Sequence, residues 1–386
     1  MRAHRPQRSA TSCPPRVLHV AHHALPHIGG LETVVAAETQ ALAARGWDVT
    51  LLTSSTGTTP GVRVEAGVKV VRIRAWNGME TRFGVPFPVF SPRLLGAMAR
   101  QVRRADVVHV HDPLYLTSWA AAFWCSVLRT PYVVHRHVGF VHHSSAVVRL
   151  VQWVVLGTVA RMVLERSAAI LPIDEFIAAG VRETVSSPAK VHVLGNAVDT
   201  TRFRPPEPGE RERLQCELDL PAEGPLVLFV GRFVPKKGFH LVAQAAGDGY
   251  RLVFVGGERP AETTDDRLLF LGALDSSKMP DVYRGVDAFV VASVGECPLT
   301  VLEAMSSGLP VLLNDDPALH SPWTAGPGVR FVDMAAGELA PAIVALVADR
   351  PTMRRIGEEG RRHVRARFSW GTHVERLEAV YRRVLA

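Results

Sequence analysis

Short apolar runs alternate with stretches of helical periodicity through the first half of the chain. Residues 31–46 repeat apolar side chains at helical spacing and stop at Gly46. The expected strands are residues 17–23, 47–55, 68–75, 106–112, 131–137 and 168–174. Because strands that are separated by helices pair in parallel, this order predicts βαβ units.

The same order restarts after residues 205–225, a stretch rich in Pro, Glu and Gly that is typical of a linker. The expected strands of the second half are residues 226–232, 251–257, 268–274, 288–293 and 310–315. One long helix is expected over 338–368, with Pro341 near its start, and a last helix over 372–385. The second half therefore predicts another parallel sheet.

Together the two halves predict two Rossmann-like, doubly wound α/β domains that face a central cleft, where such sheets bind ligands. A length of 386 residues also favours two domains over one. The expected parts are a flexible basic arm (1–15), an acceptor-side domain (16–205), a second domain (206–370) and a C-terminal helix (371–386). We expect this last helix to pack back on the first domain.

Composition narrows the class of protein. No uncharged window reaches the ~18 residues that a membrane span needs. Residues 1–15 are basic and lack an apolar run, which argues against a signal peptide. The four cysteines show neither paired nor metal-type spacing, so we expect a reducing, cytoplasmic setting without a disulfide framework.

Charge is unevenly placed. Residues 1–205 hold 23 Lys/Arg against 12 Asp/Glu, whereas residues 206–386 hold 21 against 25. A one-sided basic domain suggests an anionic partner, such as a membrane surface or a phosphorylated acceptor, although it also fits an ordinary solvated surface. Nucleic acid is disfavoured because no basic run interleaves with aromatic residues. The basic, apolar helix expected at 146–166 fits either peripheral contact with an anionic membrane or, preferably, a buried interior helix.

Two glycine-containing turns follow expected strands. In HIGGLE (27–32), Gly29 and Gly30 allow the backbone to approach a phosphate, although a plain tight turn also fits. In VGRFVPKKG (230–238), Arg232 and Lys237 place two cations where a strand ends, which suits a diphosphate. A solvated basic loop is the alternative for the second turn.

The stretch SVGECPLTVLEAMSSGLPVLL (293–313) leads from a strand into a helix. We expect the amides of Leu299, Thr300 and Val301 to be unpaired and to face an anion. Helical side chains lean toward the N-terminus, so Glu303 could reach past a phosphate to a vicinal diol. A Glu that is placed early in a helix for capping or dipole reasons is the alternative.

Taken in order, HIGGLE, DVVHVHD, PYVVHRH, LGNAVDTTRFRP, VGRFVPKKG, FVGG, FLGAL and SVGECPLTVLEAMSSGLPV resemble a family 4 glycosyltransferase of the GT-B fold. The resemblance runs from about residue 17 to the end. It implies a retaining enzyme that moves a sugar from a nucleotide-diphosphate donor to an acceptor hydroxyl. It also implies that neither a metal nor another cofactor is needed.

The resemblance implies a role for each matching residue. Those at the diphosphate, acceptor and donor sugar would be Gly29, Gly30, His137, Arg232, Lys237 and Glu296. Those at the nucleotide would be Leu299 and Thr300 for the phosphates, Glu303 for the ribose, and the backbone near Leu271 and Leu274 for the base. His109, His111 and His135 fit structural or acceptor-side positions.

Departures from the family pattern keep other functions open. Family members usually carry two glutamates with seven residues between them, but that first position is Gly295 here and the acid is Glu296. The usual Gly-Gly after the 310–315 strand is absent, and Ala197 replaces a common Gly. A nucleotide-sugar epimerase and a non-catalytic nucleotide-sugar-binding scaffold are the alternatives. Metal binding at residues 314–316 is disfavoured because no further acid or His stands at ligand spacing.

Overall fold

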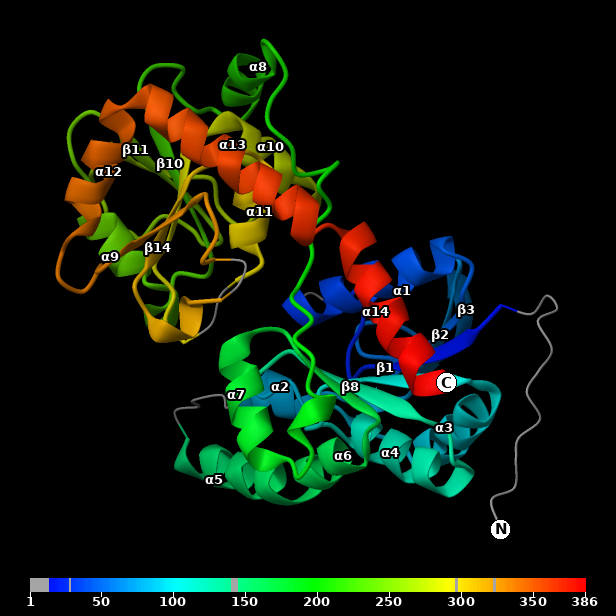
Figure 1. Cartoon of the computed structure of the whole chain (residues 1–386). Coiled ribbons are helices and arrows are strands. Elements are labelled where there is room, and N and C mark those ends of the chain that lie inside the picture. Colours follow the sequence, from blue (N-terminus) through cyan, green and yellow to red (C-terminus); the bar gives the residue numbers. More distant parts are fainter. Residues whose placement is uncertain (1–13, 28, 140–144, 296–297, 322–323) are drawn as a thin grey trace. The chain divides into compact units, whose positions relative to one another are not determined.

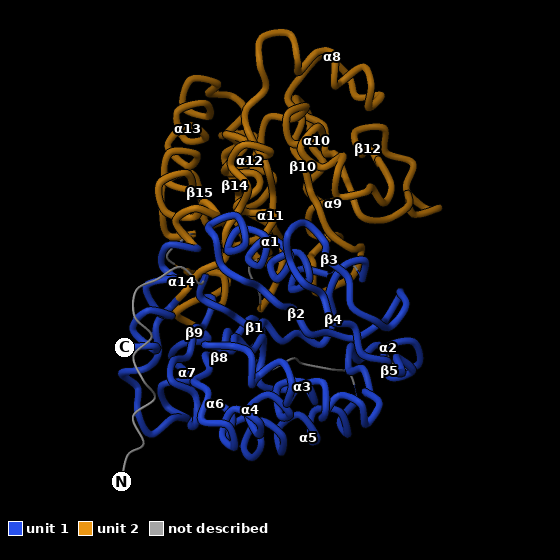
Figure 2. The backbone as a smooth tube through the Cα atoms, turned by 90° about the vertical axis from the view of Figure 1, so that its right-hand side faces the viewer, with its two compact units in different colours: residues 1–173, 177–193, 374–386 blue, residues 174–176, 194–373 orange. Residues whose placement is uncertain are grey.

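The structure is a computed structural model that describes residues 14–27, 29–139, 145–295, 298–321 and 324–386. Its contacts divide the chain into two compact units (Figure 2). Unit 1 comprises residues 1–173, 177–193 and 374–386, and unit 2 comprises residues 174–176 and 194–373. The expected boundary at 205/206 falls inside unit 2, and most of the last helix lies in unit 1.

Unit 1 is built on a seven-stranded sheet in the order β3-β4-β2-β1-β7-β8-β9. Its strands are β1 (Arg16–Val20), β2 (Asp48–Ser54), β3 (Gly61–Glu65), β4 (Val68–Ile73), β7 (Val107–His111), β8 (Tyr132–Arg136) and β9 (Ala169–Pro172). A separate two-stranded ribbon pairs β5 (Ala75–Trp76) with β6 (Val89–Phe90). Six of the seven sheet strands match expected runs.

The edge strand β3 departs from the predicted parallel pattern. It pairs with β4 in antiparallel register, Glu65 opposite Val68. Ala66 and Gly67 connect the two strands with φ values of 46° and 79°. Two consecutive positive φ values make a tight turn that matches the twist of a hairpin, so no crossover helix is needed.

Helices cover both faces of this sheet. Figure 1 shows α1 (Gly30–Ala44) and α14 (Trp370–Leu385) over one face, and α3 (Arg93–Arg104), α4 (Leu116–Leu128) and α6 (Arg161–Arg166) over the other. The remaining helices of the first 193 residues are α2 (Gly78–Phe83), α5 (Ala146–Val155), η1 (Leu156–Ala160), α7 (Glu175–Thr184) and η2 (Pro188–Lys190). Trp47 and Arg45 both bond to Glu378, which holds α14 against the end of α1.

Unit 2 repeats the architecture with a six-stranded parallel sheet in the order β12-β11-β10-β13-β14-β15. Its strands are β10 (Leu226–Val230), β11 (Arg251–Val255), β12 (Leu268–Phe270), β13 (Ala288–Val291), β14 (Val311–Asn314) and β15 (Val329–Val332). Its helices are α8 (Glu210–Glu217), η3 (Pro235–Lys237), α9 (Phe239–Gln244), η4 (Ser276–Lys278), α10 (Met279–Gly285), α11 (Thr300–Ser306), η5 (Pro317–Leu319), α12 (Leu339–Ala348) and α13 (Arg350–Arg367).

Both faces of this second sheet are apolar. Leu226 and Leu228 of β10 join one core cluster with α10, α11 and α13, whereas Val227 and Phe229 join another with α9 and α12. Strands that are buried on both faces read as continuous apolar runs, as the LVLFV sequence of β10 does.

The single helix expected over 338–368 is wrong, because the structure divides it into α12 and α13. Pro351 stands in the first turn of α13, where its missing N–H costs nothing. The side chain of Asp349 accepts a hydrogen bond from the Thr352 amide at 3.1 Å and caps the new helix.

The continuous helix Ala146–Arg166 (α5, η1 and α6) is long and apolar enough to cross a membrane by length and composition, with a mean hydropathy of 1.7. Only 17% of this apolar window is buried within the described structure. Val147, Leu150 and Trp153 are 70%, 61% and 69% exposed. The expectation of a buried interior helix is therefore wrong.

Candidate functional site

Glycine turns shape the carboxyl edge of the unit 2 sheet. Gly231, after β10, donates to Val255 at 2.9 Å, and Gly256, after β11, donates to Gly272 at 2.9 Å. Gly256 has a φ of 120°, and a Cβ there would lie 2.4 Å from the Gly231 carbonyl oxygen. The three strand ends therefore close tightly on one another, which leaves their outer edge with little side-chain bulk.

The loop after β10 carries both predicted cations of the diphosphate clamp. Arg232 is exposed and Lys237 is half-buried at the end of η3. Gly238 follows with a φ of 70°, and a Cβ on it would lie 2.3 Å from the Ala292 carbonyl oxygen. The Val294 amide donates to the Lys236 carbonyl at 3.1 Å. This loop is therefore fixed against the end of β13, which leads into α11.

The start of α11 matches the expectation only in part. Leu299 caps the helix and Thr300 is its first residue. The Val301 amide donates to the Pro298 carbonyl at 3.1 Å, so the expectation that this amide is unpaired is wrong. The Thr300 hydroxyl is shielded from solvent and has no hydrogen-bond partner within the described part of the chain.

Glu303 lies one turn into α11 and is half-buried. The Tyr283 hydroxyl, fully buried on α10, donates to Glu303 Oε2 at 2.9 Å. Burial raises the pKa of Glu303, against the opposing effects of the Tyr283 hydrogen bond and the Arg202 charge. Tyr283 was not predicted from the sequence, because it lies on another helix and no spacing rule links it to Glu303.

A second missed residue is Asp316, in the loop after β14. Its Oδ2 accepts a hydrogen bond from the Gly295 amide at 3.2 Å, and its Oδ1 accepts one from the Ala318 amide at 2.8 Å. Gly295 has a φ of 78°. Asp316 thus fixes the turn that precedes α11. It lies in the loop after β14, where the usual Gly-Gly pair of the family is absent. Glu296 lies outside the described residues.

Leu271 and Leu274 lie beyond β12, where the backbone was expected to meet the base. Both are half-buried and pack against the core cluster that includes α10 and α11. The Leu271 amide donates to the Phe254 carbonyl at 2.9 Å. Packing therefore fixes this segment of backbone at the same edge of the sheet.

In unit 1, His137 follows β8 at the carboxyl edge of the sheet and is half-buried. Its amide donates to Asp112 Oδ1 at 3.0 Å, and its Nε2 lies 3.0 Å from His111 Nδ1. Asp112 is buried, and burial raises its pKa to about 6 against the His137 backbone hydrogen bond. Asp112 was not singled out from the sequence, although it ends the DVVHVHD strand.

Gly29 and Gly30 mark the start of α1. The Gly29 backbone is extended, and a Cβ there would lie 2.2 Å from Glu32 Oε2, whereas a Cβ on Gly30 would meet nothing within 4 Å. His27 bridges two acids, with Nδ1 2.8 Å from Glu32 Oε1 and Nε2 3.0 Å from Glu80 Oε1. Gly29 therefore leaves room for an ordered side-chain group.

Comparison with known proteins defines the class of fold. The described chain is similar to a sucrose-phosphate synthase from Thermosynechococcus elongatus, with a TM-score of 0.73 and 22% identity over 96% of this chain and 99% of the other. It is also similar to Anabaena HepE in complex with UDP, with a TM-score of 0.72 and 15% identity over 95% and 100%. Two Rossmann-like α/β domains of this kind constitute the GT-B fold.

Sequence comparison then gives the family. Residues 28–202 match the model of Glycosyltransferase Family 4, and residues 210–363 match that of Glycosyl transferases group 1. The chain belongs to the family 4 glycosyltransferases, enzymes that transfer glycosyl groups.

Named relatives agree with this assignment. A D-inositol 3-phosphate glycosyltransferase of Nocardia farcinica is 31% identical over 50% of this chain, and the match spans 47% of that relative's own length. The enzyme of the same name from Corynebacterium glutamicum is 24% identical over 93% of this chain and 92% of its own.

Proposed function

We propose that this glycosyltransferase moves a sugar from a nucleotide-diphosphate donor to an acceptor hydroxyl, with retention of the anomeric configuration and without a metal or other cofactor at the diphosphate. The observation that carries the proposal is the carboxyl edge of the unit 2 sheet. There, glycine turns clear the edge, and the loop that carries Arg232 and Lys237 is held against the end of β13, which leads into α11. Anabaena HepE, which shares the fold, binds UDP.

Charge development explains why these groups suit the reaction. Breaking a glycosyl–phosphate bond builds negative charge on the diphosphate and positive charge on the sugar ring. Arg232, Lys237 and the first turn of α11 would stabilise the diphosphate charge as it grows. The departing phosphate oxygen would take the acceptor proton on the same face, which retains the configuration. His137 and Glu296 are the groups that we assign to the donor sugar.

Glu303 is assigned to the ribose. A carboxylate accepts two hydrogen bonds from a vicinal diol, and the buried Tyr283 hydroxyl fixes its orientation. The raised pKa of Glu303 reflects burial that a bound ribose would offset by donating to the carboxylate.

A thermal-shift screen with UDP, GDP, TDP and ADP and their sugars tests donor binding. A ligand at a hundred times its Kd stabilises the folded protein by about 2.7 kcal/mol. Arg232→Ala and Lys237→Ala should each weaken binding of the stabilising nucleotide about 10- to 100-fold, because each loses a charge-assisted contact. Lys236→Ala, the exposed neighbouring cation, is the matched control. Equal loss in all three variants would refute the assigned clamp.

The products distinguish the proposed reaction from its alternatives. Transfer to an acceptor with the donor's anomeric configuration, read by NMR, supports the proposal, and an inverted product defeats the retaining mechanism. Donor conversion without acceptor would instead indicate an epimerase. Nucleotide binding without turnover would indicate a scaffold, and activity gained on exchanging Gly295→Glu with Glu296→Gly would support that outcome. Activity that chelators leave unchanged is expected.

We also propose a cytoplasmic enzyme that contacts an anionic membrane peripherally through helix Ala146–Arg166. Five exposed apolar residues support this: Val147, Leu150, Val151, Trp153 and Val154. Arg149 lies among them, and Arg161 and Arg166 follow, as suits an apolar helix on an anionic surface. Flotation with anionic liposomes should be salt-sensitive and should fall in Leu150→Ser/Trp153→Ser, whereas Val344→Ser, at an exposed position of α12, is the control. Binding that is absent, or equal in all variants, would dispose of the contact.

A further inference from the structure

The middle of one face of the unit 1 sheet carries histidines. Along β1, β7 and β8, aliphatic residues that join the core with α3, α4 and α6 alternate with imidazoles that point to the opposite face. These fully buried imidazoles belong to His19, His109, His111 and His135. Helices α1 and α14 cover this face (Figure 1). A sheet buried on both faces ordinarily carries aliphatic residues at such positions, as unit 2 does.

Strand register and two helices gather the polar groups. His19 pairs with His109 across β1 and β7, and His111 pairs with His135 across β7 and β8. Glu38, which is 0% exposed, projects from α1 toward these imidazoles. Tyr381, equally buried, comes from α14. A carboxylate and several imidazoles are therefore enclosed together, an arrangement that is costly unless each group is paired or binds a metal.

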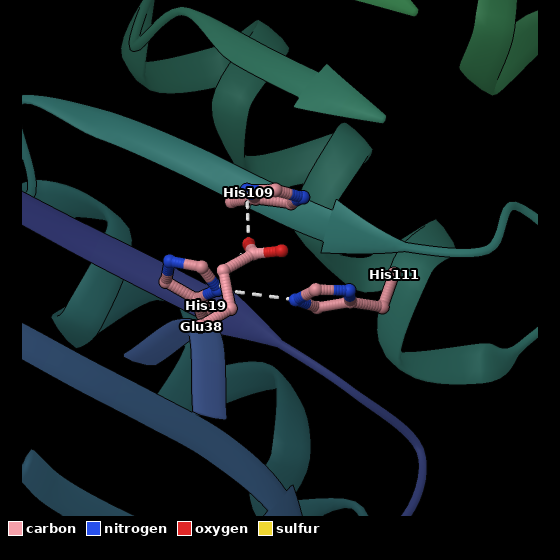
Figure 3. Close-up of side chains that lie close together, drawn as sticks. All are labelled: His19, Glu38, His109 and His111. Atoms are coloured by element: carbon pink, nitrogen blue, oxygen red, sulfur yellow. Dashed lines mark hydrogen bonds and ion pairs between the residues drawn. The ribbon is translucent and has the colours of Figure 1, made fainter. Parts of the chain in front are cut away.

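The spacing of the donor atoms matches a metal coordination shell. His19 Nδ1 lies 3.0 Å from His111 Nε2 and 3.7 Å from Glu38 Oε1, and His109 Nδ1 lies 3.3 Å from Glu38 Oε1. Bonds of about 2.0–2.1 Å place tetrahedral donors about 3.3 Å apart. The four donor atoms all lie within 4.8 Å of one another. Figure 3 shows these four side chains converging from β1, α1 and β7.

We propose that His19, Glu38, His109 and His111 bind one divalent transition-metal ion of the zinc class. Three imidazoles and a carboxylate suit Zn²⁺ and its first-row neighbours better than Mg²⁺ or Ca²⁺, which prefer shells of oxygen. Four protein ligands on a fully enclosed site leave no open position, so the ion is structural rather than catalytic. The inference is independent of the metal-free chemistry proposed for the diphosphate.

Neighbouring contacts orient two of the four ligands. His111 faces the site with Nε2 while its Nδ1 lies 3.0 Å from His137 Nε2, and His19 turns its Nε2 toward the Tyr381 hydroxyl at 3.3 Å. Partners on the far ring nitrogen are what metal-binding histidines ordinarily have. The Tyr381 hydroxyl, 2.5 Å from His109 Nδ1, must turn aside when that atom binds the ion.

Metal analysis of the full chain, purified without a polyhistidine tag, tests the site. We expect about one Zn²⁺ per chain by elemental analysis, and one Co²⁺ per chain after chelation and reconstitution, with the visible bands of tetrahedral Co²⁺. Zn²⁺ at a hundred times its Kd should raise the melting temperature of the chelated protein by about 5–10 °C. X-ray absorption of the zinc form should report light-atom ligands at about 2.0 Å, a reading that needs no variant.

Variants locate the ion. Glu38→Gln, nearly isosteric, and His111→Gln should each lower affinity at least tenfold and change the cobalt spectrum, whereas His192→Gln, in the same unit but outside the cluster, should not. Two other groups of possible ligands lie in the same unit, and His27→Gln tests that of His23, His27 and Glu80, whereas His135→Gln tests that of His111, His135 and His137. A protein that binds no ion, an octahedral spectrum, or loss that follows His27→Gln or His135→Gln instead of Glu38→Gln would overturn the proposal.

Discussion

The two units share a parallel sheet between helices, yet they fill the sheet faces differently. In unit 2 both faces are aliphatic and aromatic. In unit 1 one face is aliphatic, and the other carries His19, His109, His111 and His135 beneath Glu38 and Tyr381. The fold therefore tolerates a buried polar layer, but the layer makes its stability depend on proton and ion binding where unit 2 depends on packing.

Acid should destabilise unit 1 more than unit 2, and this is the largest difference in stability that we expect between them. In the metal-free protein, burial lowers the pKa of His19 and of His23 to about 4, so the unfolded chain binds their protons as the pH falls below 6.5 while the folded unit does not. Between pH 6.5 and 4.5 each loses about 2 kcal/mol of stabilisation. The carboxyl of Asp112, with its pKa raised to about 6, opposes this by about the same amount. His22 and His109 add to the loss because their pKa values are lowered further.

His19 and His23 together outweigh Asp112 by about 2 kcal/mol over this range, and His22 and His109 enlarge the loss in unit 1. Unit 2 should lose little stability over this range. Burial raises the pKa of Glu303, and the pKa of Glu210 is lowered to about 2, which lies below the two pH values compared. Hydrogen exchange read peptide by peptide at pH 6.5 and 4.5 measures the difference. Earlier loss of protection in unit 2 would contradict the contrast.

Apolar packing should dominate the folding stability of unit 2. Phe254 is fully buried in β11, and Phe254→Ala should lower the free energy of unfolding by about 3–5 kcal/mol through lost burial and a residual cavity. Chemical denaturation followed by fluorescence and circular dichroism measures it. Val344→Ala, at a half-exposed position on α12, is the control and should change stability by less than about 0.5 kcal/mol. Similar losses in both variants would mean that the face is loosely packed.

A matched pair of tyrosines compares the two units at single-atom resolution. Tyr381→Phe removes a hydroxyl that is 2.5 Å from His109 Nδ1 in a fully buried layer, and should cost about 1–3 kcal/mol. Tyr283→Phe removes one hydrogen-bond donor to the half-buried Glu303 and should cost about 1 kcal/mol.

Nucleotide binding should respond in the opposite order, with the larger effect in Tyr283→Phe and the smaller in Tyr381→Phe. Tyr283→Phe releases Glu303 and should raise the Kd for the nucleotide, because Glu303 is the proposed ribose ligand. Tyr381→Phe should leave that Kd unchanged when measured on folded protein by calorimetry. If Tyr381→Phe and Tyr283→Phe lowered the free energy of unfolding equally, the polar layer would be better solvated than its burial indicates.

The local sequence pattern predicted the strands and helices of the fold, because strand alternation and helix periodicity depend on residues that are close in sequence. The runs around Leu228 and Phe254 gave buried strands within two residues of their observed bounds. The same alternation in VVHVH shows that His109 and His111 share one face. It cannot show what covers them, since Glu38 and Tyr381 arrive from helices far away in the chain.

For the candidate site too, the sequence indicated residues that stand in local motifs but not those that act through contacts between elements. Arg232, Lys237 and Glu303 stand in motifs whose residues lie close in sequence, so the resemblance could indicate them. Tyr283 and Asp316 act through contacts across 20 and 21 residues, which follow from packing between elements and not from any spacing. The break at Asp349 was missed because the apolar period continues across it, although the Pro that follows was a visible sign.

The smallest expected effect on stability is at Gly30, and it isolates function from folding. A Cβ there meets nothing within 4 Å at the start of α1, so Gly30→Ala should change the free energy of unfolding by less than about 0.5 kcal/mol. Gly238→Ala, by contrast, forces a side chain onto a φ of 70° and against the Ala292 carbonyl, and should destabilise unit 2 by about 1–3 kcal/mol. If Gly30 lets the backbone approach the donor diphosphate, Gly30→Ala lowers kcat/KM at least tenfold while the melting temperature stays the same. Unchanged kcat/KM would remove Gly30 from the site and leave the turn as a simple helix start.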